Sequence, residues 1–519
     1  MTLLTPERNR ILSNFARMFT SLLVGIFLVR ELLSVGPKAY GLYAFAVTGF
    51  GVAIIIREVL RVSFVAFLSQ SLSQSSAISN SYRIAVKTMM SVAFLLGLIA
   101  VTIMAGVAII LPFLGFDGKH VRLAQAFFGL RALSAFLMII VYPLFLSTLV
   151  QQKQVTQNIF LTVERLIELV AIILAVYFFK TGIEYQTLTI FALVSMAFSS
   201  LFYLSIFLSS NIGKQISILP AFPKQETLKF HWPELSAGLK DILGPLLYFR
   251  FDLVFLTAVF GPIAALILGL GVQFSGYVRQ VNQVLIAGLD ARFAAASFSK
   301  SKAQIEKKEN LRQIFRSISH LQGLVIFFLI GFLILFLPEL LSMWLGDRLE
   351  NSGTSLKELR YLIYVLLPGI AANTMAQSWI IMQTGAGKLR GFVNFILGTA
   401  ILNPILLTLF ILISKANTSG AIFVAASIYS TLNCLCFMGI IPVIVAKQLG
   451  ETPRVLLQPL LGPLLAGLVT VTIALIGSRL IWNENRIATF IIFMIGFIVS
   501  FGYFSIFMAR KLSNNTPHT

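Results

Sequence analysis

The segment Val35-Gly36-Pro37-Lys38-Ala39-Tyr40-Gly41 separates two long apolar runs, residues 11–33 and 40–67. A run of about 20 apolar residues is long enough to cross a bilayer as an α-helix, and a Gly-Pro pair is a strong signal for a break between helices. A second pair, in Phe260-Gly261-Pro262-Ile263, separates the apolar runs 239–260 and 263–289 in the same way. The two pairs predict that one helical unit occurs twice in the chain.

The rest of the chain continues this pattern of apolar runs joined by short polar connections. Hydrophobic residues make up 57% of the chain and charged residues only 12%, whereas soluble proteins are about 25% charged. This composition excludes a large soluble catalytic domain. A span-length window predicts about fourteen transmembrane helices. The predicted spans are 11–33, 40–67, 86–113, 121–149, 155–179, 187–208, 239–260, 263–289, 318–344, 359–382, 391–414, 421–445, 455–481 and 487–508.

The spans divide the chain into four parts. We expect residues 1–210 to form an amino-terminal six-helix half, 211–238 a cytoplasmic linker, and 239–446 a carboxy-terminal six-helix half, with helices 13 and 14 in 447–519. Both Gly-Pro pairs lie on the same membrane side, so the halves would be parallel repeats about an axis along the membrane normal. The predicted fold class is an all-α integral membrane protein with two six-helix repeats and two extra helices.

The chain is strongly basic, with 40 Lys and Arg against 20 Asp and Glu, a formal net charge of +20. In a membrane protein such an excess favours anionic lipid or a phosphate-bearing ligand. Basic residues concentrate in the connections on the amino-terminal side, which predicts that both termini are cytoplasmic. The densest cluster, between residues 299 and 317, would rest on anionic membrane lipids. Nucleic acid is not indicated, because the basic residues do not line one exposed face.

Arginine is the cation that recurs inside the predicted spans, where a charged side chain costs at least about 2.5 to 3.5 kcal/mol. Guanidinium keeps its charge and matches phosphate oxygens in a two-pronged fashion. We therefore expect these arginines to bind a phosphate-bearing ligand, with Arg250 and Arg279 as the main pair. The other candidate ligands are Arg17, Arg57 and Arg61. Arg17 could instead snorkel to the membrane surface, and Arg57 and Arg61 could form a structural salt-bridge cluster with Glu58.

Two further sets of polar residues complete the predicted site. Asp252, Glu164 and Glu168 are candidates for binding a coupling ion, H+ or Na+, because intramembrane carboxylates commonly serve as relays. Glu164 and Glu168, on one face of a helix, could share a proton. As structural alternatives, Asp252 could pair with an arginine across the interface and Glu168 with Arg165 in a local ion pair. The amides that flank Arg279 suit sugar hydroxyls or ordered water in a cleft. They are Gln273, Gln280 and Asn282.

Other chemistry is not indicated. The chain has no phosphate-binding G-x-x-x-x-G-K-[ST] loop, and its four histidines show no zinc spacing. Its two cysteines, Cys434 and Cys436, lie in one apolar run and predict no disulfide. We expect no cofactor and no metal besides the coupling ion.

Residues 28–46, L-V-R-E-L-L-S-V-G-P-K-A-Y-G-L-Y-A-F-A, resemble a signature of bacterial polysaccharide flippases of the Wzx type, in which a Leu-Gly-Pro-x-x-Tyr-Gly-Leu-Tyr pattern joins the first two helices. Arg250-Phe251-Asp252 followed by Phe260-Gly261-Pro262 is similar to the family's seventh helix. The family belongs to the multidrug/oligosaccharidyl-lipid/polysaccharide exporter superfamily. The resemblance implies a V-shaped bundle in the bacterial cytoplasmic membrane, with polysaccharide polymerase machinery as a partner.

Three functions follow from these patterns. The leading hypothesis is a flippase that moves polyprenyl-diphosphate-linked oligosaccharide across the membrane by alternating access, for export of lipopolysaccharide or exopolysaccharide. A cation-coupled multidrug exporter is the alternative within the same superfamily, and an arginine-rich cleft suits organic cations poorly. An integral-membrane glycosyltransferase, polymerase or ligase would need acid/base or metal-binding carboxylates. The connection 345–358 offers Asp347 and Glu350 without such a motif, so we expect a transporter and not an enzyme.

Overall fold

A computed structural model describes the chain as a bundle of long helices, with no strand in the part that it describes. The described residues are 4–46, 52–73, 80–114, 118–151, 153–178, 183–210, 212, 215, 222, 225–286, 289, 293, 304–346, 349, 355–385, 390–414, 417–449, 451–480 and 486–513. Nine of the described helices are long and apolar enough to cross a membrane, and Arg486–Val499 is a shorter apolar helix. The predicted all-α membrane fold is confirmed.

The amino-terminal half contains the first seven labelled α-helices. They are α1 (Leu4–Val35), α2 (Pro37–Ala44), α3 (Val52–Ser73), α4 (Asn80–Ile110), α5 (Val121–Val150), α6 (Gln154–Ile173) and α7 (Glu184–Ser209). Short 3-10 helices, η2 (Leu111–Leu114) and η3 (Gly118–His120), lie between α4 and α5, and the π-helix η4 (Leu174–Phe178) extends α6. Each predicted span of this half coincides with one helix or with consecutive helical segments.

The predicted spans of the carboxy-terminal half and of the last two helices also coincide with helical segments. The segments of the half are α8 (Gln225–Pro245), the π-helix η6 (Leu246–Arg250), α9 (Phe251–Phe260), α10 (Pro262–Ile286), α12 (Gln304–Leu345), α14 (Leu356–Gly385), α15 (Arg390–Ser414), α16 (Thr418–Cys434), the π-helix η7 (Leu435–Ile440) and α17 (Ile441–Leu449). The last two helices are α18 (Pro453–Leu480) and α19 (Arg486–Ser513). Helix α8 begins inside the segment assigned to the linker 211–238, because its first turns are amphipathic and a hydropathy window does not detect them.

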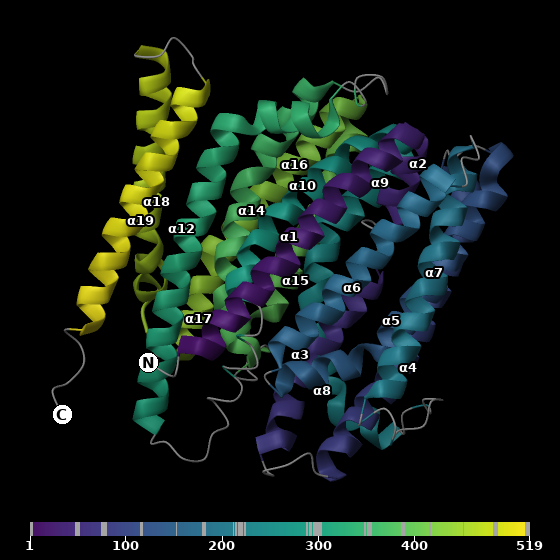
Figure 1. Ribbon diagram of the computed structural model, residues 1–519, viewed down its shortest axis with the longest axis horizontal. Coiled ribbons are helices and arrows are strands. Elements are labelled where there is room, and N and C mark those ends of the chain that lie inside the picture. The colour runs from purple at the N-terminus through teal and green to yellow at the C-terminus, as the bar shows by residue number, and fades with distance from the viewer. Residues whose placement is uncertain are drawn as a thin grey trace.

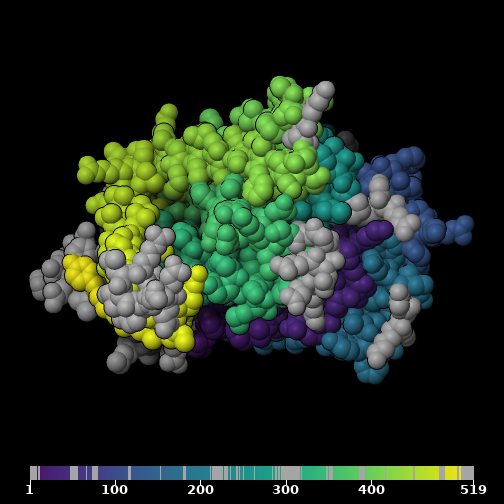
Figure 2. Space-filling view, turned by 90° about the horizontal axis from the view of Figure 1, so that it is seen from above, coloured from purple at the N-terminus to yellow at the C-terminus, as the bar shows by residue number. Residues whose placement is uncertain are grey.

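The two halves lie side by side, and α18 and α19 stand at the edge of the carboxy-terminal half (Figure 1). The first turns of α1 and the last turns of α19 lie at the same end of the bundle, the lower edge of Figure 1. From above, the yellow hairpin and the blue helices occupy opposite ends of the molecule (Figure 2). The halves meet where α1 and α2 pack against α10 and where α3 packs against α8.

The two Gly-Pro pairs open equivalent helices that meet at this interface. Pro37 begins α2 and Pro262 begins α10. Gly261, with φ 81°, ends α9 in a conformation that favours glycine. At Gly269 of α10 an added Cβ would lie 2.8 Å from the Cβ of Ala44 in α2, closer than van der Waals contact allows. The repeated motif therefore brings α2 and α10 into close backbone packing across the halves.

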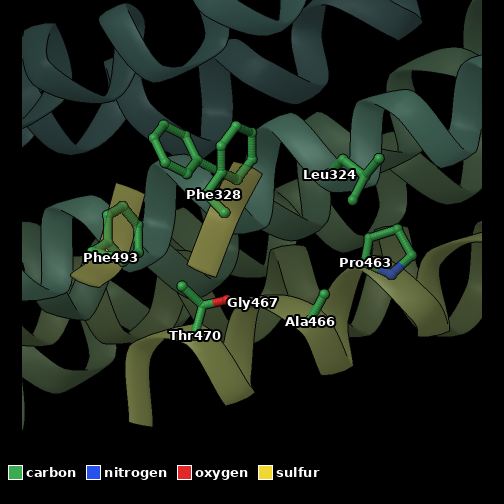
Figure 3. Close-up of a pocket in the computed structure, with 8 residues that line it drawn as sticks. Leu324, Phe328, Pro463, Ala466, Gly467, Thr470 and Phe493 are labelled. Carbon is green, nitrogen blue, oxygen red and sulfur yellow. The ribbon is translucent and has the colours of Figure 1, made fainter. Parts of the chain in front are cut away.

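An aromatic ladder attaches α19 to α12. The ring centroids of Phe328 and Phe497 are 3.8 Å apart, and those of Phe328 and Phe493 are 5.1 Å apart. Beside the ladder, Phe328 and Phe493 face Pro463, Gly467 and Thr470 of α18 across a shallow apolar groove (Figure 3). The groove contains none of the polar residues that the sequence singled out, so it lies apart from the predicted site.

Candidate functional site

The first polar cluster lies inside the amino-terminal half and is centred on Glu164 of α6. The Arg57 guanidinium of α3 is 3.0 Å from Glu164 Oε2, and Tyr203 of α7 donates to Glu164 Oε1 at 3.0 Å. Arg57 also lies over the Tyr142 ring, 5.0 Å from its centroid. Helices α3, α5, α6 and α7 thus converge on one half-buried ion pair.

A neighbouring carboxylate on α6, Glu168, has two arginine partners. Arg165 lies 2.7 Å from Glu168 Oε2, and Arg131 of α5 lies 3.4 Å from Oε1. Arg61 pairs with Glu58 at 2.7 Å. The hypothesis that Glu164 and Glu168 share a coupling proton is not supported by this geometry, because each carboxylate contacts a different guanidinium. Arg61 thus has the salt bridge with Glu58 that the structural alternative expected, whereas Arg57 pairs with Glu164 instead.

Arg17 of α1 differs from the other arginines of this half. It is half-buried, and its strongest charged neighbours are Arg57, Arg165 and Glu58. Its guanidinium makes no hydrogen bond or ion pair with another described residue. Five arginines of this region face three glutamates, a surplus of two positive charges. The arginines are Arg17, Arg57, Arg61, Arg131 and Arg165, and the glutamates are Glu58, Glu164 and Glu168. Counted over the described residues alone, this excess of arginine over glutamate would attract an anion.

A second concentration of positive charge lies in the carboxy-terminal half. Arg250, the last residue of the π-helix η6, and Arg279 of α10 lie within Coulomb range of each other. Arg279 also lies near Tyr429 of α16. The sequence placed Arg250 and Arg279 on consecutive spans, and the structure brings them together. Two like charges at this range repel each other, and an anion bound near both would lower that repulsion.

Asp252, two residues after Arg250, is 3% exposed. The expected arginine partner is absent among the described residues, and Asn403 of α15 takes its place, donating to Asp252 Oδ1 at 2.7 Å. The same Asn403 amide donates to the carbonyls of Leu247 at 2.9 Å and Tyr248 at 3.2 Å. A π-helix displaces carbonyls from the regular hydrogen-bond ladder, so Asn403 joins the carboxylate to the irregular turn before it.

Asn403 and the residues that surround it were not predicted as site residues from the sequence. Tyr248 donates to Thr399 of α15 at 2.8 Å, and its ring packs edge-on against Tyr429 at a centroid distance of 6.0 Å. A signal was present, because Asn403 is an amide inside an apolar run, where unsatisfied polar groups are costly. Its partner on another span could not be identified without the fold.

The amides around Arg279 face two directions. Gln273 and Gln280 share one half-buried face of α10 with Tyr277, and Gln273 donates to the Tyr277 hydroxyl at 3.1 Å. Asn282 lies on another face, fully buried, and donates to the Thr374 carbonyl of α14 at 3.3 Å. The Asn282 amide is thus enclosed within the carboxy-terminal half in this conformation, and its role as a sugar ligand stays a prediction without support from this geometry. The Gln280 side-chain oxygen has no hydrogen-bond partner in the described part of the chain.

Metal chemistry finds no support in the described ranges, where no group of three or more His, Cys, Asp or Glu side chains is placed to hold an ion. What the arrangement offers is fixed positive charge in both halves and one buried carboxylate held by an amide. Fixed positive charge of this kind attracts anions.

Comparison with solved structures identifies the fold. No protein-family profile and no curated protein matches the sequence. The structure is similar to that of the lipid II flippase MurJ in an inward closed conformation, with a TM-score of 0.65 and 12% identity, covering 96% of this chain and 99% of MurJ. It is also similar to the eukaryotic MATE transporter AtDTX14, with a TM-score of 0.61 and 13% identity, covering 88% of this chain and 98% of AtDTX14. A third similar structure is MATE in complex with MaD3S, with a TM-score of 0.60 and 13% identity, covering 85% of this chain and 96% of that chain. The chain therefore has the fold of the MATE transporters and the MurJ flippase.

Proposed function

We propose that this protein is a flippase of the Wzx type, which translocates a polyprenyl-diphosphate-linked oligosaccharide across the bacterial cytoplasmic membrane by alternating access. The observation that carries the proposal is the positive charge between the helices, with a surplus of two in the amino-terminal half and the Arg250–Arg279 pair in the other. A diphosphate that crosses the membrane interior needs compensating charge along its path. Guanidinium supplies that charge in a form matched to phosphate oxygens.

The fold supports the same proposal. One of the similar structures is a lipid II flippase, and others are MATE transporters. The MATE likeness makes a cation-coupled multidrug exporter the second candidate. The concentration of arginine disfavours it, because an organic cation in this site would be repelled by charges of its own sign. Anionic membrane lipids and polysaccharide polymerase machinery remain proposed partners, and cytoplasmic termini a proposed orientation.

Coupling to an ion gradient is part of the proposal. Asp252 is the candidate for binding H+ or Na+, since Asn403 is the one neighbour that the structure gives to its carboxylate in the described part of the chain. Glu164 and Glu168 are weaker candidates because arginine already neutralises both. Asp252→Asn would keep the size of the side chain and remove its charge. We expect translocation by this variant to become independent of the imposed gradient.

The proposal is tested with purified protein in vesicles that contain polyprenyl-diphosphate-linked oligosaccharide in one leaflet. Arg17→Gln, Arg250→Gln and Arg279→Gln should each slow translocation by about tenfold or more, since a hydrogen bond to a charged group is worth about 1.5 to 3 kcal/mol. Arg486→Gln is the matched control, because Arg486 of α19 pairs with Glu339 at 3.0 Å, away from both clusters.

Two outcomes would contradict the proposal. One is normal translocation by all three variants at normal protein abundance. The other is export of a cationic dye, driven by an ion gradient, at a rate that the three substitutions increase. A carrier lipid without the diphosphate should not be translocated by the unaltered protein.

A further inference from the structure

An amide cluster ties the two halves together on the membrane side that holds the amino terminus. Asn14 lies in the first turns of the membrane span of α1 and is fully buried. Its side-chain Nδ2 donates to the backbone carbonyl of Val284 at 3.0 Å, 270 residues along the chain. Val284 lies in the last turn of α10, where backbone carbonyls need partners outside the helix. Asn14 of one half thus satisfies the end of a helix in the other.

Two residues of α6 hold the Asn14 amide in this orientation. Asn158 donates to Asn14 Oδ1 at 2.7 Å and to Ser13 Oγ at 2.8 Å. Gln154 donates to the same Oδ1 at 3.3 Å. Both amides are buried, with 2% exposure at Asn158 and 7% at Gln154. Because Oδ1 accepts from α6, the Asn14 Nδ2 group is directed toward α10.

The same seam between α1 and α10 is closed further along α1. Gly25 provides the space for Tyr277 of α10, since an added Cβ would lie 2.8 Å from the tyrosine hydroxyl. Trp344 of α12 donates to the Ile26 carbonyl at 3.3 Å. Both contacts lie at adjacent residues beyond the middle of α1. Nearer the amino terminus, the Asn14 amide supplies a hydrogen bond across the seam.

We propose that Asn14, oriented by Asn158 and Gln154, is a latch that keeps the seam between α1 and α10 closed on the side of the amino terminus. Opening that side would expose the Val284 carbonyl and the amides to water, which replaces their hydrogen bonds at little net cost. When the seam is closed, the same groups are buried and must hydrogen-bond to one another, because an unpaired buried polar group is costly. The cluster is therefore stable in two arrangements, closed and dry or open and hydrated, as an alternating-access device requires. The inference rests on the alternating access proposed above.

The test measures access to the seam without any substrate, so it is independent of whether the cargo is a lipid-linked sugar. In a background with Cys434→Ala and Cys436→Ala, Gln280→Cys places a reporter thiol one helical turn before Val284, on the half-buried face of α10. A membrane-impermeant thiol reagent is applied separately from each side of sealed vesicles. Asn14→Leu should raise the modification rate from the amino-terminal side by roughly tenfold, equivalent to about 1.4 kcal/mol, without raising it from the far side.

Two further variants complete the experiment. Asn158→Leu removes a hydrogen bond that orients Asn14, without changing a contact to α10. It should give a smaller increase in the modification rate from the same side. If Asn14→Leu does not fold, Asn158→Leu decides the question. Thr20→Val is the matched control, because Thr20 lies on α1 and bonds only to the Ala16 carbonyl of its own helix among the described residues. Equal rates for folded Asn14→Leu, Asn158→Leu and Thr20→Val would overturn the latch, as would an equal rise from both sides, which indicates general loosening.

Discussion

Replacement of Asn403 by leucine tests whether its amide organises the carboxylate and the irregular turn of the seventh span. The substitution keeps a side chain of similar length and removes three interactions, to Asp252 Oδ1 at 2.7 Å, to the Leu247 carbonyl at 2.9 Å and to the Tyr248 carbonyl at 3.2 Å. Asn403 is fully buried, so nearby water cannot readily replace the lost donors.

The expected loss of stability follows from these contacts. A hydrogen bond to a charged group contributes about 1.5 to 3 kcal/mol and a neutral one about 0.5 to 1.5 kcal/mol. The amide has two hydrogens for three acceptors, so one strong and one neutral bond are the realistic loss. Asn403→Leu should therefore lower the free energy of unfolding by about 2 to 4 kcal/mol. In a background with Asp252→Leu the same change should cost less, since the charged acceptor is gone.

Equilibrium unfolding in mixed detergent micelles measures both values in a double-mutant cycle. The matched control is Asn394→Leu on the same helix, where Asn394 is exposed and accepts only from Lys240 in the described structure, at 3.0 Å. We expect its effect to be below about 0.5 kcal/mol. If Asn403→Leu resembled this control, or if the effects of Asn403→Leu and Asp252→Leu were additive, the Asn403 amide would not be what holds the Asp252 carboxylate.

Two other substitutions test packing and charge. Gly369→Ala in α14 would place a Cβ 2.6 Å from the Ser430 backbone in α16, and thermal unfolding should show a loss of stability of about 1 to 3 kcal/mol. Gly398→Ala is the control, because Gly398 has open space around it, and it should be neutral or stabilising. Equal behaviour of the two variants would contradict the close packing. Arg57→Gln should destabilise the protein by about 1.5 to 3 kcal/mol, because it leaves the half-buried Glu164 without its cation. Arg57→Gln combined with Glu164→Gln should recover most of that loss in the same denaturation assay, and no recovery would count against the pair.

Much of the architecture was accessible from local sequence. The Gly36-Pro37 and Gly261-Pro262 pairs predicted helix breaks, and helices begin at Pro37 and Pro262. Span positions were also predicted well, since the need to bury a stretch of apolar residues in lipid is a property of that stretch alone. The start of α8 at Gln225 was missed because amphipathic turns carry no such signal.

The candidate site was only partly accessible. Unusual residues were recognised from the cost of a charge in an apolar run, which singled out Arg250, Arg279 and Asp252. Their partners were not recognised. Glu164 lies 107 residues from Arg57, and Asn403 lies 151 residues from Asp252. Periodicity and spacing relate residues within one helix, and they carry no information on which helix faces which.

The amino-acid sequence by itself determined that this chain spans a membrane, where its helices lie and which side chains are costly in lipid, because each of these depends on composition over about one span. Tertiary structure decided which arginines are neutralised, that Asn282 is enclosed, and that Asn14 of one half caps α10 of the other. These properties depend on the rotation and approach of helices from distant parts of the chain. Burial and hydrogen bonding between them exist only once the two halves have packed together.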